Sequence, residues 1–209
     1  MKDMQVERSK ILARTTPALR DILAPGLRVV FCGINPGLSS AMLGHHFSNR
    51  TNRFWRAIHL AGFSAEEITP KDDESILSYG CGLTTVAERA TTCAADLSRD
   101  EFEKSASSFF AKIAHYSPMY VAFLGKPAFS ALFNRNKVTW GKQDLLLTGS
   151  RTWVLPNPSG LNRSFSLRQL VAAYSELRIA VEELVLEQHG AKALRARRDD
   201  IFGNAGRMA

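Results

Sequence analysis

The sequence predicts an α/β protein with three layers, in which helices flank a central, mostly parallel β-sheet. Short apolar segments rich in β-branched and aromatic residues stop at glycines or polar loops, as buried strands do. Segments with helical periodicity or helix-capping residues lie between them. This alternation favours parallel strands, because parallel neighbours are usually joined by a crossover helix.

Strands are expected where the apolar runs are short and bounded. Residues 27–33 read Leu-Arg-Val-Val-Phe-Cys-Gly, and the closing glycine leads into Ile34-Asn35-Pro36-Gly37, which is a loop sequence. Similar runs predict further strands at residues 81–86, 119–124, 145–147 and 152–155.

Helices are expected between these strands. Residues 52–61 have Thr51 or Asn52 as a cap and Gly62 as a stop. Another helix opens at Thr69-Pro70, and the capping box Ser98-Arg99-Asp100-Glu101 leads a helix to about residue 115. The remaining helices are a short one at 126–133 and a long amphipathic one at 166–187.

The length of 209 residues suits one domain with tails. Residues 1–26 form a basic, polar N-terminal arm with helical character around 9–23. A single domain is expected over 21–187. Residues 188–209 mix charges with Gly and Ala, and we expect a loosely ordered C-terminal tail there.

Two irregular loops follow predicted strands, at residues 33–50 and 156–164. Long irregular loops in compact domains are usually functional, and ligands of open α/β sheets bind beyond the carboxyl ends of the strands. We therefore expect both loops to converge on one cleft. Two unrelated surface loops are the alternative.

Common cofactor and metal motifs are absent from the sequence. Gly125-Lys126 and Gly141-Lys142 lack the earlier glycine of a phosphate-binding loop, and Gly33–Gly37 does not match the dinucleotide fingerprint. The histidines lack metalloprotease spacing, and the three cysteines contain no CxxC pair. No metal or cofactor is implied.

The chain is expected to be cytoplasmic, in a bacterial-type cytosol or nucleoid, without a membrane partner. The first twenty residues are basic and polar, and no run reaches the ~18–20 apolar residues of a membrane span. An odd number of scattered cysteines fits a reducing compartment.

The net charge of +7 suggests an anionic partner, and its distribution is uneven. Residues 21–63 carry four bases and one acid, and residues 125–165 carry six bases and one acid. Residues 64–104 carry four bases and ten acids, so this stretch is expected to face away from an anion. Charges scattered over a solvated surface are the alternative.

Both strand-end loops carry sequences with a known counterpart. Gly33-Ile34-Asn35-Pro36-Gly37 and Asn157-Pro158-Ser159-Gly160-Leu161-Asn162-Arg163, in this order, resemble the uracil-DNA glycosylase superfamily. The match is closest to its mismatch-specific uracil-DNA glycosylase and thymine-DNA glycosylase branch. Asn52-Arg53-Phe54-Trp55 and Trp140-Gly141-Lys142 agree, and the resemblance covers about residues 21–180.

The resemblance implies removal of a base from DNA after the base has been flipped out of the helix. Asn35 matches the residue that positions the attacking water. An amide cannot accept the proton, but its oxygen can orient the water. Turn formation alone is the alternative role of Asn35.

The resemblance also implies a base pocket. Phe47 matches the aromatic that stacks on the flipped base, Ile34 would form a wall, and Ser40 would lie near C5 of a pyrimidine. Asn157 matches a position from which an amide could hydrogen-bond the departing base. Phe47 as a core residue and Asn157 as a turn residue are the alternatives.

Gly160-Leu161-Asn162-Arg163 resembles the loop with which the family wedges DNA apart. Leu161 would replace lost stacking, unless it folds back on the core, and Arg163 would bind the orphaned base or a phosphate. Lys126, Lys142 and Arg151 are candidates for contacts with the DNA backbone, with Arg50 and Arg53 as further candidates.

The function expected from the resemblance is that of a monofunctional DNA glycosylase in base excision repair. It would act as a monomer and hydrolyse uracil from double-stranded DNA, preferentially at G·U mismatches. Neither motif contains a nucleophilic lysine, so no lyase activity through a Schiff base is expected. Where some relatives carry a lysine after Thr84, this chain has Thr85, so an activity tied to that lysine is not expected either. The alternatives are a broader glycosylase acting on ethenocytosine, thymine, xanthine or hypoxanthine, and a catalytically weak module that binds DNA lesions.

Overall fold

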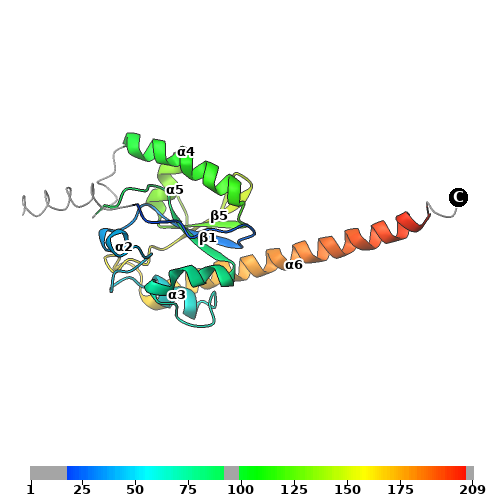
Figure 1. The fold of residues 1–209 in the computed structure, drawn as a ribbon, viewed down its shortest axis with the longest axis horizontal. Coiled ribbons are helices and arrows are strands. Elements are labelled where there is room, and N and C mark those ends of the chain that lie inside the picture. Colours follow the sequence, from blue (N-terminus) through cyan, green and yellow to red (C-terminus); the bar gives the residue numbers. More distant parts are fainter. Residues whose placement is uncertain (1–17, 92–98, 206–209) are drawn as a thin grey trace, which may run out of the picture.

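The computed structural model describes residues 18–91 and 99–205, with side chains for all of these except Arg99 and residues 192–205. The elements in chain order are β1 (Val29–Gly33), α2 (Leu38–Leu43), α3 (Phe54–Leu60), the 3-10 helix η1 (Pro70–Tyr79), β2 (Cys81–Thr85), α4 (Arg99–Tyr116), β3 (Tyr120–Leu124), α5 (Lys126–Phe133), β4 (Gly141–Leu147), β5 (Ser150–Leu155) and α6 (Leu167–Ala205). Figure 1 shows α4 and α5 on one side of the strands, and α3 with the first part of α6 on the other.

The sheet has five strands in the order β2-β1-β3-β5-β4. β1 pairs in parallel with β2 and β3, β3 pairs in parallel with β5, and only β4 is antiparallel. The predicted three-layer architecture with a mostly parallel sheet is confirmed. The carboxyl ends of β1, β2, β3 and β5 therefore meet at one edge of the sheet.

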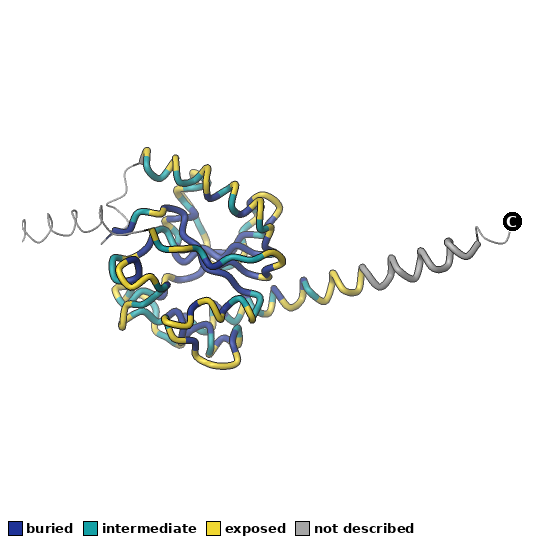
Figure 2. Tube along the Cα trace, viewed as in Figure 1, coloured by how far each residue is buried: buried dark blue, intermediate teal, exposed yellow. Residues whose placement is uncertain are grey.

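Alternation along the strands divides the core into two layers. In β1, Val29 and Phe31 pack in the layer beneath α3 and α6, whereas Val30 and Cys32 pack in the layer beneath α4 and α5. All four side chains are fully buried, and Figure 2 shows the strands as the buried centre of the molecule. A sheet covered on both faces explains why its strands read as continuous apolar runs.

The helices differ from expectation in three places. The loop after β1 contains α2, which ends at Gly44 in the left-handed conformation. The helix expected at Thr69 is a 3-10 helix, η1. Where a loosely ordered tail is expected from residue 188, α6 continues to Ala205 and extends beyond the body of the molecule (Figure 1), because Ala, Leu, Lys and Arg in this stretch favour a helix. The Ser98 cap lies outside the described residues.

The described part of the N-terminal arm packs on the domain. Ile22 forms an antiparallel bridge with Leu83 of β2, through two hydrogen bonds of 2.9 and 2.8 Å. Asp21 accepts one hydrogen bond from the Thr84 hydroxyl and forms an ion pair with Lys112 of α4, with both distances at 2.5 Å. Residues 1–17 of the expected arm lie outside the described residues. Among the described helices, none is long and apolar enough to cross a membrane.

Candidate active site

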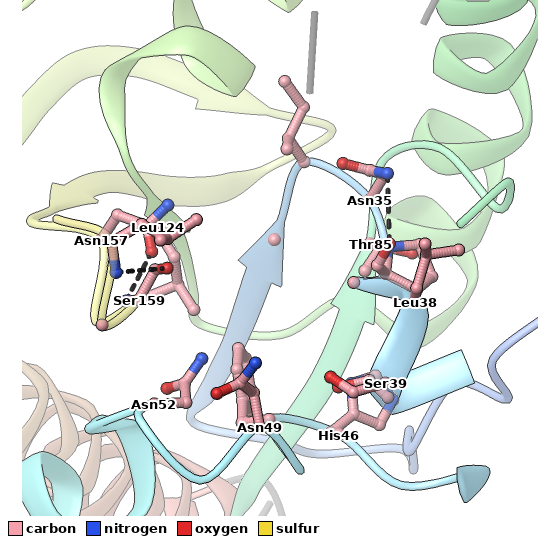
Figure 3. Close-up of a pocket in the computed structure, with 18 of the residues that line it drawn as sticks. Asn35, Leu38, Ser39, His46, Asn49, Asn52, Thr85, Leu124, Asn157 and Ser159 are labelled. Atoms are coloured by element: carbon pink, nitrogen blue, oxygen red, sulfur yellow. Dashed lines mark hydrogen bonds between the residues drawn. The ribbon is translucent and has the colours of Figure 1, made fainter. Parts of the chain in front are cut away.

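A pocket of about 680 Å³ lies at the carboxyl ends of the parallel strands. Its walls come from the segment after β1, the end of β2 and the segment after β5, so the predicted convergence of the two irregular loops is confirmed. Figure 3 shows Asn35 and Asn157 on either side of the end of β1, with Asn49 and Asn52 below them. The lining includes the following residues: Leu19, Ile34, Asn35, Ser40, His46, Phe47, Asn49, Thr51, Asn52, Thr85, Thr91, Asn157, Gly160, Leu161 and Asn162.

The Asn35 side chain is fixed in one orientation by residues far along the chain. Its Nδ2 donates hydrogen bonds to the carbonyl oxygens of Pro36 (3.2 Å) and Arg89 (3.1 Å), and to the hydroxyl oxygen of Thr91 (2.6 Å). Carbonyl oxygens only accept, so they define which end of the amide carries the hydrogens. No described residue donates to Oδ1, which leaves this oxygen to accept from a molecule in the pocket.

The acidic segment 64–104 supplies part of this site. Thr85 and Thr91 line the pocket, and the carbonyl of Arg89 holds Asn35. The stretch that was expected to face away from an anion thus reaches the site at these three residues. Its backbone and hydroxyl groups are what the site uses, and these carry no charge.

Phe47 has a backbone conformation that is unusual for a bulky residue, with φ at 52°. Its ring stacks on Phe54 of α3, with centroids 3.9 Å apart and planes 25° from parallel. The preceding N–H, of His46, is held by the carboxylate of Asp73 at 2.8 Å. Phe47 is thus both half-buried against the core and part of the pocket wall.

His46 is a pocket residue that the sequence reasoning missed. It is 3% exposed, and its Nε2 lies 2.9 Å from the carbonyl oxygen of Arg20. A carbonyl only accepts, so Nε2 carries the proton and Nδ1 is the acceptor of the neutral ring. Burial lowers the pKa of His46, and the carbonyl of Arg20 and the carboxylate of Asp73 oppose this shift without cancelling it. The sequence could not predict the contact with Arg20, because it depends on how residues 18–22 pack against the domain.

Ser40 and Ile34 lie in the pocket lining as expected. Ser40 belongs to α2 and is 7% exposed. Its hydroxyl oxygen accepts hydrogen bonds from the N–H and the hydroxyl of Ser48, both at 3.3 Å. The hydroxyl is therefore held in place at the pocket wall.

Asn157 forms a turn through one end of its amide only. Its Oδ1 accepts a hydrogen bond from the N–H of Ser159 at 2.9 Å, and its carbonyl oxygen accepts one from Asn162 Nδ2 at 2.8 Å. Its Nδ2 makes no hydrogen bond with the described residues. Asn157 can therefore form the turn through Oδ1 and still offer Nδ2 as a hydrogen-bond donor to a molecule in the pocket.

The loop expected to act as a wedge projects from the surface. Leu161 is 87% exposed, so it does not fold back on the core. Gly160 lies so close to Thr51 that an added Cβ would come within 2.3 Å of its hydroxyl oxygen and 2.6 Å of its carbonyl oxygen. Arg163 is exposed outside the pocket lining, beside Leu161 and Asn162 in sequence.

The candidate phosphate ligands do not all lie together. Lys126 begins α5 next to the pocket, with its Nζ 4.5 Å from the ring centroid of Trp140, and exposed Lys142 lies near the start of β4 at the same sheet edge. Arg151 is near the start of β5, at the opposite edge. Arg151 therefore does not lie with the two lysines as expected, because β5 runs parallel to β3 and its first residues are at the end of the sheet away from the pocket. Arg50 is exposed.

The described residues offer neither a thiolate nor a metal centre. Burial raises the pKa of the Cys32 thiol well above its ordinary value and that of Cys81 to about 12. Thiols with such values are not nucleophilic near neutral pH. No group of three or more His, Cys, Asp or Glu side chains in the described part of the chain could hold a metal ion.

Comparison with known proteins agrees with this geometry. The family model of the uracil DNA glycosylase superfamily matches residues 21–178. The fold is similar to the solution NMR structure of a protein from Methanosarcina acetivorans that is provisionally described as a uracil DNA glycosylase, with a TM-score of 0.54 and 19% identity. The match covers 78% of this chain and 98% of the other. The match of the family model to most of the chain shows that the protein belongs to the uracil DNA glycosylase superfamily.

Proposed function

We propose that this protein is a monofunctional DNA glycosylase that hydrolyses uracil from double-stranded DNA, preferentially opposite guanine. Membership of the superfamily indicates a DNA glycosylase. The observation that carries the finer proposal is the fixed amide of Asn35, a residue of the pocket lining whose Oδ1 has no hydrogen-bond partner among the described residues.

In this proposal the oxygen of Asn35 orients the attacking water. The amide does not act as a base, since it cannot take up a proton near neutral pH. Its contribution is to hold the water in line with the sugar carbon while the C–N bond to the base breaks. As the new C–O bond forms, the water loses a proton, which the departing base anion takes up. Because three hydrogen bonds fix Nδ2, the oxygen is already in position before substrate binds.

The departing base becomes an anion, and the proposal assigns its stabilisation to Asn157. The Nδ2 of this residue can donate a hydrogen bond to a carbonyl oxygen of the base while Oδ1 maintains the turn. Phe47 stacks on the base, and stacking tolerates any base because every base has a π-face. Discrimination between uracil and other bases therefore depends on polar contacts at the pocket wall, including those of Ser40.

The preference for duplex DNA rests on the exposed loop. Leu161 can fill the space vacated by the flipped nucleotide, and Arg163 can bind the orphaned guanine or a phosphate. Leu161 has 87% of its surface exposed, so its side chain is free to enter the DNA stack from the rim of the pocket.

The proposal includes hydrolysis without strand cleavage. A lyase of this type needs a lysine amine to form a Schiff base with the sugar, and the described pocket lining contains Thr85 and Thr91 but no lysine. The product would be an intact strand with an abasic site.

The direct test is incubation with duplexes that carry uracil, thymine, ethenocytosine or xanthine opposite guanine, followed by alkali. We expect alkali-dependent cleavage, fastest at uracil. Cleavage without alkali would contradict the absence of lyase activity. Equal release of several bases would favour the broader glycosylase. Binding without any release would favour a lesion-binding module.

A further inference from the structure

Arg53 holds the wedge loop from inside. Its guanidinium donates hydrogen bonds to four carbonyl oxygens of residues 157–165, the segment between β5 and α6 that includes Gly160–Arg163 and is called the wedge loop from here on. The bonds run from Nε to Pro158 (3.3 Å), from Nη2 to Ser159 (2.9 Å) and Asn162 (2.8 Å), and from Nη1 to Phe165 (2.5 Å). The N–H of Arg53 donates a further hydrogen bond of 3.0 Å to the carbonyl oxygen of Pro158.

These bonds give the side chain a different use from the one expected for it. A half-buried guanidinium whose described partners are all loop carbonyls is not available to a DNA phosphate. No carboxylate of the described residues pairs with it. Its donors instead satisfy the carbonyl oxygens of a segment that has no helix or strand partner for them.

Arg53 also connects the wedge loop to the pocket. It is the N-cap of α3 and follows Thr51 and Asn52, which line the pocket. Thr51 touches Gly160 so closely that no side chain fits between them. The pocket floor and the loop that carries Leu161 are therefore joined both by the guanidinium and by direct contact.

We propose that Arg53 is a positioning residue that sets the wedge loop for DNA before DNA binds. The inference rests on the proposed function, since it assumes that the loop wedges a duplex. Because Arg53 fixes the backbone of the loop, Leu161 is held in an exposed position in the free protein. The loop therefore loses little conformational entropy when the base is flipped. Pre-organisation of this kind lowers the cost of binding.

The chemistry of the contact predicts that lysine cannot replace Arg53. The guanidinium spreads five donors over a rigid plane and reaches four separate oxygens, whereas an ammonium is a compact charge with three donors. The test variants are Arg53→Lys and the neutral Arg53→Gln. The matched control is Arg56→Gln, on the same helix, which removes an exposed ion pair with Glu67.

The first readout is the ratio of uracil excision from duplex to excision from single-stranded DNA under single-turnover conditions. A misplaced wedge should lower kcat/KM on the G·U duplex by about 100-fold in both variants and leave the single-stranded rate within about threefold. Arg56→Gln should leave both rates unchanged. Equal losses on both substrates, or full activity of Arg53→Lys, would overturn the proposal.

A double-mutant cycle shows whether Arg53 acts through Leu161. Leu161→Ala alone should lower duplex excision and spare the single strand. In the Arg53→Lys background, Leu161→Ala should cost much less, because the two residues act in one step. Additive losses would overturn the proposed route.

A readout without catalysis separates this inference from the proposed function. Amide hydrogen exchange of the free protein should rise across residues 157–165 in both Arg53 variants, with the strands of the sheet unchanged. If the wild-type protein excises no uracil, the proposed function fails, and this measurement still tests the pre-organised loop. Unchanged exchange in the loop would overturn the positioning role, and a rise throughout the sheet would show a general stabilising role instead.

Discussion

The Nδ2 atom of Asn35 lies 2.6 Å from the hydroxyl oxygen of Thr91, which is 56 residues further along the chain. This bond and the bond to the carbonyl of Arg89 hold Nδ2 and leave Oδ1, at the other end of the amide, without a partner among the described residues. The loop after β1 is thus completed by the segment that follows β2, and the proposed water-binding atom depends on both.

Removal of the Thr91 hydroxyl should weaken this arrangement without destroying it. Thr91→Val keeps the shape of the side chain, and Asn35 keeps its two carbonyl acceptors. One neutral hydrogen bond is worth about 1 kcal/mol, so kcat should fall about fivefold while KM remains unchanged. Steady-state kinetics on the G·U duplex measure both constants, with Thr91→Ser as the control that retains the hydroxyl. A change confined to KM would contradict the prediction.

An aspartate in place of Asn35 should not improve the enzyme, although a carboxylate is the better base. Asn35→Asp replaces the donor that faces the carbonyls of Pro36 and Arg89 with an acceptor, so the side chain is repelled from its position. Excision at pH 7.5 should fall by about 100-fold. Asn35→Ala should abolish excision and retain duplex binding in a gel-shift assay. A faster Asn35→Asp enzyme would contradict the prediction that the carbonyls of Pro36 and Arg89 displace a carboxylate from this position.

A methyl group at position 160 should displace the wedge loop. In Gly160→Ala the new Cβ would meet both the side chain and the carbonyl oxygen of Thr51, so the loop must move. Duplex excision should fall by about 100-fold. Removing the Thr51 side chain as well should restore only part of the rate, because the carbonyl remains. Gly190→Ala, in open space on α6, is the control and should be silent.

Salt dependence should distinguish the two sheet edges. Lys126→Gln and Lys142→Gln should each reduce the slope of log Kd against log salt by about 0.9 if each lysine neutralises one phosphate. Arg151→Gln, at the far end of β5, should leave the slope unchanged. Fluorescence anisotropy of a labelled duplex between 50 and 200 mM salt measures the slopes. An equal effect of all three substitutions would indicate a second DNA contact at the far edge.

Acid should destabilise the protein through His46. Burial lowers its pKa, so the unfolded chain binds a proton more tightly than the folded protein does. Stability is therefore retained at neutral pH and falls as the pH drops below the ordinary value of about 6.5, until the folded-state pKa is reached. Urea unfolding from pH 7.5 to 5 should show a smaller loss for His46→Gln than for the wild type. His115→Gln, at an exposed position, is the control, and equal pH dependence of His46→Gln and wild type would contradict the assignment.

Local pattern was sufficient for the strands and the position of the site. Buried strands reveal themselves through continuous apolar runs, and their carboxyl ends in a parallel sheet necessarily lie at one edge. Ile34, Asn35, Ser40, Phe47 and Asn157 consequently line one pocket, as expected. The two motifs also indicated the uracil-DNA glycosylase superfamily, which the match over residues 21–178 confirms.

The tertiary structure alone decided how those residues are held. The partners of Asn35 lie 54 and 56 residues away, and those of Arg53 lie 105 to 112 residues away. Such pairs leave no periodic signal, since nothing in local sequence records which distant carbonyl a donor will face. For the same reason, the contact of His46 with Arg20 could not be predicted. The position of Arg151 away from Lys126 and Lys142 could not be predicted either, because the end of the sheet at which a residue lies depends on the direction of its strand.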